Sequence, residues 1–113
     1  MQLDVRTRGL PHPDWYRGHA RRRLGLALGR FADRIAQVDV ALEDVNGPRG
    51  GVDKRCTLRA LLRRGGPPLV VRNLDRHLSV AIDLAADRLA RSVVRAIERR
   101  RSRRRSSPDA RSA

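Results

Sequence analysis

The 113 residues carry a formal charge of +14, from 26 Lys and Arg against 12 Asp and Glu, and they include a single cysteine, Cys56. A lone cysteine excludes an intrachain disulfide and a cysteine-based zinc site, and a chain of this length has room for one domain. The positive charge predicts a polyanionic partner, and the anion that arginine suits best is a nucleic-acid backbone. Lys54 is the one lysine, and arginine-rich usage of this kind is explained equally by phosphate recognition and by a GC-rich genome.

The chain begins with a predicted strand and a predicted helix. Residues 2–8 alternate between apolar and polar side chains, which is typical of a half-buried strand. Pro13 suits the first turn of a helix, and we expect that helix to span residues 13–33. Its three glycines weaken it by about 1 kcal/mol each relative to alanine. Its apolar face comprises Tyr16, Ala20, Leu24, Ala27, Phe31 and Ile35.

Three further strands are predicted in the middle of the chain. Residues 37–45 alternate again, and residues 46–51 form a glycine-rich loop. Residues 54–64 then make a third strand that pairs with the second as a hairpin. After a Gly-Gly-Pro-Pro turn, residues 69–72 make a short fourth strand, and its proline start suits an edge.

The last predicted element is an amphipathic helix from about Leu78 to Arg105, capped by Asp75 or Ser79. At about 100° per residue, one face gathers the apolar side chains Leu78, Ile82, Ala86, Leu89, Val93, Ala96 and Ile97. The opposite face carries Arg88, Arg91, Arg95 and Arg99. We predict that the first face packs on a sheet and that the arginines contact RNA. The carboxylates of Asp83 and Asp87 suit the first turns of the helix and local pairing with Arg91.

The predicted order β-α-β-β-β-α defines an α+β fold, with one four-stranded sheet and two helices packed on one face. We expect the domain to span residues 1–101. Residues 102–113 form a basic tail without an apolar face, and we expect it to be disordered in isolation.

The sequence resembles the ribosome hibernation-promoting factor and ribosome-associated inhibitor family, also called sigma-54 modulation proteins, in its short form. The resemblance rests on three segments in order: Phe31-Ala32-Asp33-Arg34-Ile35 before the second strand, Ala81-Ile82-Asp83, and Ala86-Asp87-Arg88-Leu89-Ala90-Arg91. The loop and third strand over residues 44–56 also resemble short proteobacterial members. The resemblance covers about residues 1–100.

This resemblance implies a non-enzymatic protein that binds the decoding region of the small ribosomal subunit. It would block the messenger and transfer RNA sites there during stationary phase or stress. It also implies that Asp87, Arg88, Leu89 and Arg91 match the helix motif of the family. Long members add a C-terminal dimerisation domain for which we expect this chain to be too short, so any pairing of ribosomes would need another mechanism. We expect a monomer.

Four further residues are candidate RNA contacts. Arg22 lies opposite the apolar face of the first predicted helix, where an RNA contact and simple solvation are equally good interpretations. Arg49, Lys54 and Arg55 lie on or beside the glycine-rich loop, whose backbone can approach phosphates. That loop lacks the Gly-Lys-Ser/Thr spacing of a phosphate-binding Walker motif, which argues against nucleotide binding there.

The remaining patterns argue against an enzyme, a metal site and a membrane protein. The three histidines are dispersed, Cys56 lies on the inward side of a strand, and no catalytic motif is present, so we expect no cofactor, metal or small-molecule substrate. Residues 1–5 do not begin a secretion signal and no apolar run approaches about 18 residues, so we expect a cytoplasmic location.

Two alternatives remain open at this stage. The α-β-β-β-α order after the first strand resembles a general double-stranded-RNA-binding domain, and the older family name suggests a protein-interaction regulator, for example of a sigma factor. Trp15 is the one aromatic side chain left for stacking on a base, so we expect recognition of RNA shape and backbone.

Overall fold

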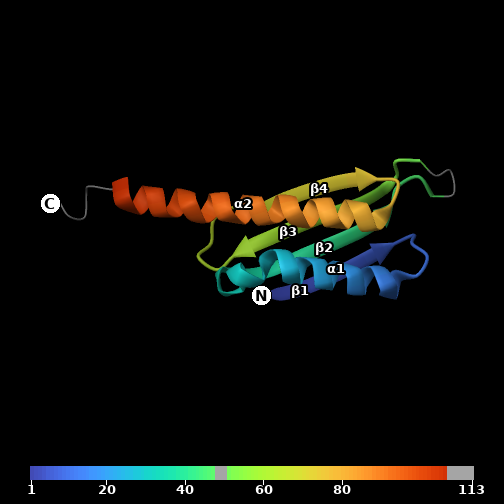
Figure 1. Cartoon of the computed structure of the whole chain (residues 1–113), viewed down its shortest axis with the longest axis horizontal. Coiled ribbons are helices and arrows are strands. Elements are labelled where there is room, and N and C mark those ends of the chain that lie inside the picture. The colour runs from blue at the N-terminus through green and yellow to red at the C-terminus, as the bar shows by residue number, and fades with distance from the viewer. Residues whose placement is uncertain (48–50, 107–113) are drawn as a thin grey trace.

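The computed structural model describes residues 1–47 and 51–106. The elements are β1 (Gln2–Arg8), α1 (Pro13–Leu28), the 3-10 helix η1 (Gly29–Arg34), β2 (Ile35–Asp44), β3 (Lys54–Leu62), β4 (Leu69–Asp75) and α2 (Leu78–Ser106). Both α-helices lie on the same face of one four-stranded sheet (Figure 1). The predicted β-α-β-β-β-α fold is therefore confirmed.

The sheet is mixed, with the strands in the order β1-β2-β3-β4. β1 pairs with β2 in parallel, which α1 makes possible as a crossover, and the other two pairs are antiparallel. A buried row, Val5, Val40, Leu58 and Val71, crosses all four strands in register. Alternation along each strand therefore directs one set of side chains to the helices and the other to the open face.

The core lies between the sheet and the two helices. On α2, the predicted apolar face is buried from Leu78 to Ala96, with Ile97 partly buried against it. Leu24 and Leu28 of α1 are fully buried, and side chains of this size contribute about 1.5–3 kcal/mol each when they leave water. This packing fixes which side of each helix faces outward.

The first helix ends earlier than predicted. α1 stops at Leu28, and residues 29–34 form the tighter 3-10 turn η1 instead of continuing to residue 33 as an α-helix. Gly25 and Gly29, which have poor helix propensity, lie at this transition. Ile35 is consequently the first residue of β2 and is buried there, rather than completing the apolar face of the helix.

The ends of β3 and β4 also differ from the prediction. β3 ends at Leu62, two residues before the predicted end, and β4 continues three residues beyond the predicted end, to Asp75. The Asp75 carboxylate accepts a hydrogen bond from the His77 N–H at 2.9 Å just before α2, whereas Ser79 lies inside that helix.

The C-terminal helix runs beyond the predicted domain boundary. α2 ends at Ser106, one residue beyond the predicted helix end at Arg105, so it includes residues 102–106 of the predicted tail. Residues 107–113 of the predicted tail lie outside the described residues. In the described part of the chain, no helix is long and apolar enough to cross a membrane.

Candidate nucleic-acid interface

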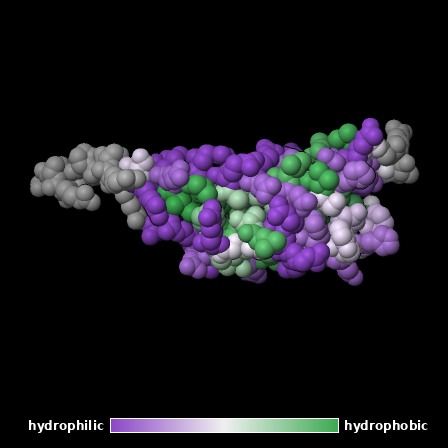
Figure 2. Space-filling model, viewed as in Figure 1, coloured by the Kyte–Doolittle hydropathy of each residue, from purple (hydrophilic) through white to green (hydrophobic). Residues whose placement is uncertain are grey.

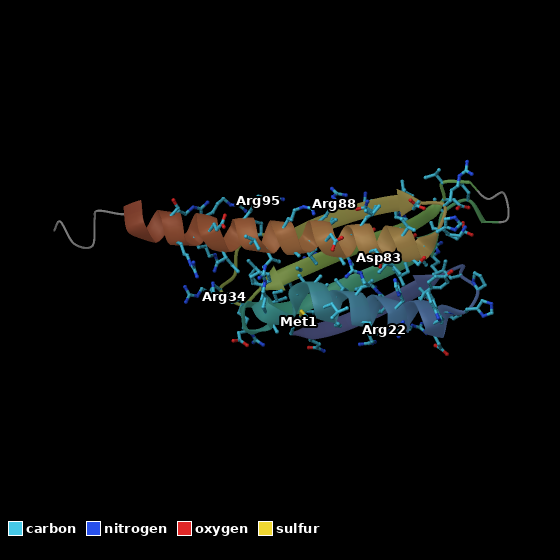
Figure 3. The ribbon with its side chains drawn as sticks, viewed as in Figure 1. Met1, Arg22, Arg34, Asp83, Arg88 and Arg95 are labelled. Atoms are coloured by element: carbon cyan, nitrogen blue, oxygen red, sulfur yellow. The ribbon has the colours of Figure 1, made fainter. Side chains whose placement is uncertain are left out.

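The outer face of α2 carries the four arginines predicted from the sequence, Arg88, Arg91, Arg95 and Arg99, which we call the arginine row. All four are exposed. Arg88 and Arg95 lie along the margin of α2 that faces away from α1 (Figure 3). Among the described residues, no salt bridge includes any member of the row. Their positive charge is therefore available to an external anion.

Arg88 differs from the rest of the row because its guanidinium is held on the edge strand. Its Nη1 donates to the Arg72 carbonyl oxygen at 2.9 Å and to the Asn73 Oδ1 at 2.7 Å. Both acceptors are neutral, so the charge of Arg88 is positioned without being cancelled. Arg95 makes a weaker local contact, a 3.3 Å hydrogen bond to the Ser92 hydroxyl.

Two carboxylates of α2, those of Asp83 and Asp87, pair with α1 instead of the arginine row. Arg23 of α1 donates from Nε to the Asp83 Oδ1 at 3.0 Å and from Nη2 to the Asp87 Oδ1 at 2.9 Å. His19 Nε2 lies 2.9 Å from the same Asp83 oxygen. The sequence predicted that these carboxylates pair with Arg91 on their own helix. That prediction was wrong, because α1 brings Arg23 between them.

Lys54, a predicted RNA contact, lies between two carboxylates at the base of the loop. Its Nζ is 2.9 Å from the Asp53 Oδ1 and 3.4 Å from the Asp44 Oδ2, and the Asp53 side chain is fully buried. Asp44 also accepts the N–H groups of Asn46 and Gly47. Two carboxylates of the protein therefore neutralise the charge of Lys54. The side chain holds together the two ends of the loop, which we call the loop base.

The pKa values of this loop cluster follow from the same contacts. Burial alone would raise the pKa of Asp44, but hydrogen bonds from Gly47, Lys54 and Asn46 and the charge of Lys54 lower it below the ordinary 3.8. The hydrogen bond to Asp53 raises the pKa of Lys54 above 10.5; burial opposes this shift and Asp44 adds to it. Both groups are therefore charged near neutral pH.

Arg55, another predicted contact, faces the open side of the sheet. Its Nη2 donates to the Glu43 Oε2 at 3.1 Å, and its neighbour Arg59 lies 3.7 Å from the Asp39 carboxylate. Cross-strand pairs of opposite charge stabilise a sheet modestly. The open face consequently mixes both signs of charge.

The last two predicted contacts do not join the row. Arg22 is exposed on α1, on the margin farthest from Arg88 and Arg95 (Figure 3). Arg49 lies outside the described residues. The structure therefore brings together the four arginines of α2, and it separates them from Arg22, Lys54 and Arg55.

The family assignment follows from a comparison with known proteins. A family model described as sigma 54 modulation protein / S30EA ribosomal protein matches residues 3–101. The chain belongs to this family. The resemblance inferred from the sequence is thereby confirmed.

Solved structures of two proteins support the same fold for this family member. The N-terminal domain of protein Y from Thermus thermophilus is 27% identical, with a TM-score of 0.67 over 84% of this chain and 98% of that one. A ribosomal subunit interface protein from Coxiella burnetii is 13% identical, with a TM-score of 0.69 over 87% and 99%, which shows a shared fold. The search of curated proteins gave no match.

In this sigma 54 modulation family member, the cysteine and the exposed tryptophan both pack against other side chains. Cys56 is buried in the core, and burial raises the pKa of its thiol to about 12. Within the described ranges, no three His, Cys, Asp or Glu side chains gather in a way that would hold a metal. Trp15 is half exposed and stacks on His19, with ring centroids 5.2 Å apart.

Sequence reasoning missed one group of arginines in this family member. Arg34, Arg63, Arg64, Arg100 and Arg101 come together where η1, the end of β3 and α2 meet. The Arg-Arg pair just before Gly65 and the Arg-Arg pair at 100–101 are visible in the sequence. Their proximity depends on the tertiary fold, so no local pattern reveals it.

Proposed function

We propose that this chain binds the small ribosomal subunit with the arginine row against ribosomal RNA, and that it occupies the messenger and transfer RNA sites of the decoding region. It would thereby silence translation in stationary phase or under stress, acting as a monomer and without catalysis. The observation that carries the proposal is the arginine row itself, four guanidinium groups on one helix face with no carboxylate partner among the described residues, in a member of a ribosomal protein family.

Spacing along α2 supports contact with a phosphate backbone. Arg88, Arg91, Arg95 and Arg99 follow one another at intervals of three or four residues, so one neighbour lies about 5–6 Å from the next along the helix. Arginine presents a planar fork that binds phosphate oxygens in pairs, and it stays charged at every physiological pH. Each phosphate that it neutralises adds close to one unit to the salt dependence of binding.

The two faces of the molecule suggest the orientation on the ribosome. The helix layer carries the arginine row and Arg22, whereas on the open sheet face Arg55 and Arg59 lie beside Glu43 and Asp39. An RNA surface repels such carboxylates. We therefore place the helix layer toward the RNA.

Steric occlusion is the mechanism that fits these features. In the described part of the chain, Trp15 is the one large aromatic side chain that is exposed, and it is stacked on His19. A single aromatic offers no platform for several unstacked bases, so we expect recognition of shape and backbone. The folded domain then acts by filling space that other RNAs need.

The test is sedimentation of the purified chain with ribosomal subunits at near-physiological salt. We expect the chain to travel with the small subunit and to be displaced by messenger RNA together with initiator transfer RNA. Starved cells should show it in small-subunit and whole-ribosome fractions. Its absence from both fractions would overturn the proposal.

Two other outcomes would favour the alternatives. Binding to naked duplex RNA as tightly as to small subunits would indicate a general double-stranded-RNA-binding module. Salt-insensitive binding to a protein such as a sigma factor would indicate an interaction regulator, because a contact made mainly by arginine and phosphate weakens steeply with salt.

A further inference from the structure

A second positively charged feature lies beside the C-terminal half of α2, on a different side of the helix from the arginine row. It is a hollow of about 370 Å³ between η1, the end of β3 and α2, lined by Arg34, Arg63, Arg64, Arg100 and Arg101 with Asp33, Leu62 and Ile97. Pockets of this volume are at the lower end of those that hold small molecules. We call this hollow the arginine pocket.

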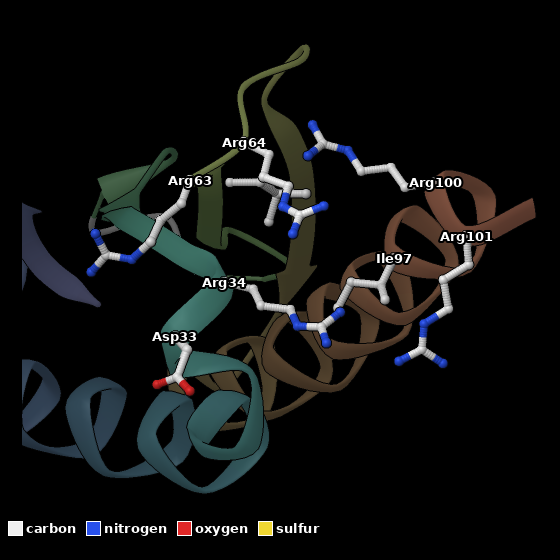
Figure 4. Close-up of a pocket in the computed structure, with 8 residues that line it drawn as sticks. Asp33, Arg34, Arg63, Arg64, Ile97, Arg100 and Arg101 are labelled. Carbon is white, nitrogen blue, oxygen red and sulfur yellow. The ribbon is translucent and has the colours of Figure 1, made fainter. Parts of the chain in front are cut away.

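The charge of the arginine pocket is largely uncompensated. Five guanidinium groups and one carboxylate leave a formal charge of +4 around it. Within the described ranges, no salt bridge includes any of these arginines, and Asp33 is not paired with them either. Arg34 and Arg64 point into the hollow, whereas Arg63 and Asp33 point away from it (Figure 4).

Backbone contacts hold the walls of the pocket in place. The Arg63 N–H donates to the Arg34 carbonyl oxygen at 2.9 Å, which fastens the end of η1 to the end of β3. Arg100 reaches from α2 and donates from Nη2 to the Gly65 carbonyl oxygen. Gly65 and Gly66 both have positive φ, and a side chain at Gly66 would come within 3.2 Å of the Arg100 guanidinium. The positive φ values of this turn favour glycine, and Arg100 would have to shift slightly to admit a side chain at Gly66.

A second hollow, with both apolar and charged walls, adjoins the arginine pocket. It has a volume of about 320 Å³ and shares Arg34, Ile97 and Arg101 with that pocket; Phe31 and Val94 form its apolar wall, and Arg30 and Glu98 also line it. The Arg30 guanidinium lies 5.1 Å from the centre of the Phe31 ring. Figure 2 shows hydrophobic surface among hydrophilic residues between α2 and η1. A planar apolar group thus has a place beside the guanidinium groups.

We propose that the arginine pocket and the adjoining hollow bind a nucleoside triphosphate or a related polyphosphorylated nucleoside. The phosphates accept hydrogen bonds from Arg34, Arg64 and Arg101, and the base packs against Phe31 and Ile97. Arginine recognises phosphate through paired, charge-assisted hydrogen bonds, and an aromatic wall favours a flat ring. This ligand site is separate from the arginine row and does not rest on ribosome binding.

The same phosphate chemistry has a second source, the ribosomal RNA backbone, and the experiment distinguishes the two. Isothermal titration of the full chain at near-physiological salt uses ATP, GTP, AMP and inorganic triphosphate as probes. We expect ATP or GTP to bind at least tenfold more tightly than AMP, because AMP lacks two phosphates, and more tightly than inorganic triphosphate, because the latter lacks a base.

Matched variants locate the site. Arg34→Gln with Arg64→Gln should weaken triphosphate binding at least tenfold, and Phe31→Leu should weaken ATP but not inorganic triphosphate. The control is Arg6→Gln with Arg8→Gln, which removes the same charge from β1 and should leave both affinities within about twofold. Circular dichroism and thermal melting establish that each variant is folded.

Three results would overturn the proposal. Equal weakening by the β1 control would mean that ATP follows the net charge. Inorganic triphosphate binding as tightly as ATP would exclude a place for the base. Absence of triphosphate binding, together with loss of small-subunit binding in the Arg34→Gln, Arg64→Gln variant, would assign the arginines to ribosomal RNA.

Discussion

The two halves of α2 differ in what their charged side chains contact. In the first half, Asp83 and Asp87 lie against α1 and accept hydrogen bonds from Arg23. From Arg91 onward, the arginine row continues through Arg95 and Arg99 with no carboxylate partner among the described residues. One half uses charge to join two helices, and the other leaves charge for a partner.

This difference shows that counting arginines does not measure an RNA-binding surface. Arg23 and Lys54 each lie beside two carboxylates, so little of their charge reaches solvent. Arg91 and Arg99 form no salt bridge among the described residues. An arginine becomes a candidate RNA contact when folding brings no carboxylate to it, and the following predictions test that distinction.

The largest expected effect is on ribosome binding when two arginines of the row are replaced by glutamate. Arg91→Glu with Arg95→Glu should weaken binding to small subunits by about 100-fold or more, because two phosphate contacts are replaced by repulsion. Arg88 is left unchanged because it is bonded to β4. Sedimentation or a filter-binding titration measures the affinity.

The matched control reverses the same amount of charge on the open sheet face. Arg6→Glu with Arg8→Glu should change the affinity by less than about threefold, since long-range attraction between exposed charges is strongly screened at physiological salt. Equal losses in the two variants would mean that net charge, and not the arginine row, determines binding.

A smaller effect is expected on stability. There Arg23, which pairs with Asp83 and Asp87, should contribute more than Arg95 of the arginine row. Arg23→Met should lower the free energy of unfolding by about 1–2 kcal/mol, a figure reduced because Asp83 and Asp87 are partly exposed to solvent. Arg95→Met should lower it by less than about 0.5 kcal/mol, as expected for a surface position. Urea denaturation followed by circular dichroism measures both.

Affinity for the small subunit should show the reverse order. Arg95→Met should weaken binding while Arg23→Met, assayed well below its melting temperature, should bind nearly as the parent chain does. If Arg23→Met bound less well than Arg95→Met, the division of α2 into a structural half and a binding half would be wrong.

The salt dependence of binding offers a finer comparison. Replacing Arg95 by Gln should reduce the slope of log affinity against log salt by close to one unit, which is about the contribution of one phosphate contact. Arg23→Gln should leave the slope unchanged, because the partners of Arg23 are carboxylates of the protein. Titrations at several salt concentrations give both slopes.

The smallest effect concerns the loop cluster and appears at the extremes of pH. Since the pKa of Asp44 is lowered below 3.8 in the folded state, its contribution to stability is present above that pH and is lost as the pH falls through the folded value. Since the pKa of Lys54 is raised above 10.5, its contribution is present below that pH and is lost as the pH rises through the folded value.

Melting temperature measured against pH tests this cluster. Lys54→Met should flatten the alkaline loss, and it should also lower stability near neutral pH because Asp53 is left buried beside Asp44 without its cation. Arg76→Met is a suitable control, because Arg76 is exposed and, within the described ranges, no salt bridge includes it. An unchanged profile in Lys54→Met would mean that Lys54 does not hold the loop base.

The sequence predicted the apolar face and the arginine face of α2 correctly, because the side chains of a long helix repeat at one fixed period on both faces. Ile82 and Leu89 on the apolar side are buried, and Arg91 and Arg95 on the other side are exposed. Strand alternation was equally informative, since Val40 faces the core as its spacing requires. Regular geometry therefore carries most of the fold.

Features that depend on contacts between elements were not predictable in the same way. The end of α1 is set by the competition between three glycines and the entry of Ile35 into β2, which local propensity does not rank. The pairing of Arg23 with Asp83 spans 60 residues, and the arginine pocket joins residues as distant as Arg34 and Arg101. Such charges meet only when the chain has folded.

The most direct test of the central claim is a cryo-electron microscopy structure of this chain bound to the small ribosomal subunit. We predict that Arg91, Arg95 and Arg99 lie within hydrogen-bond distance of ribosomal RNA phosphates in the decoding region, with the open sheet face turned away from that RNA. A complex in which the sheet face contacts the RNA and the arginine row faces solvent would contradict the account.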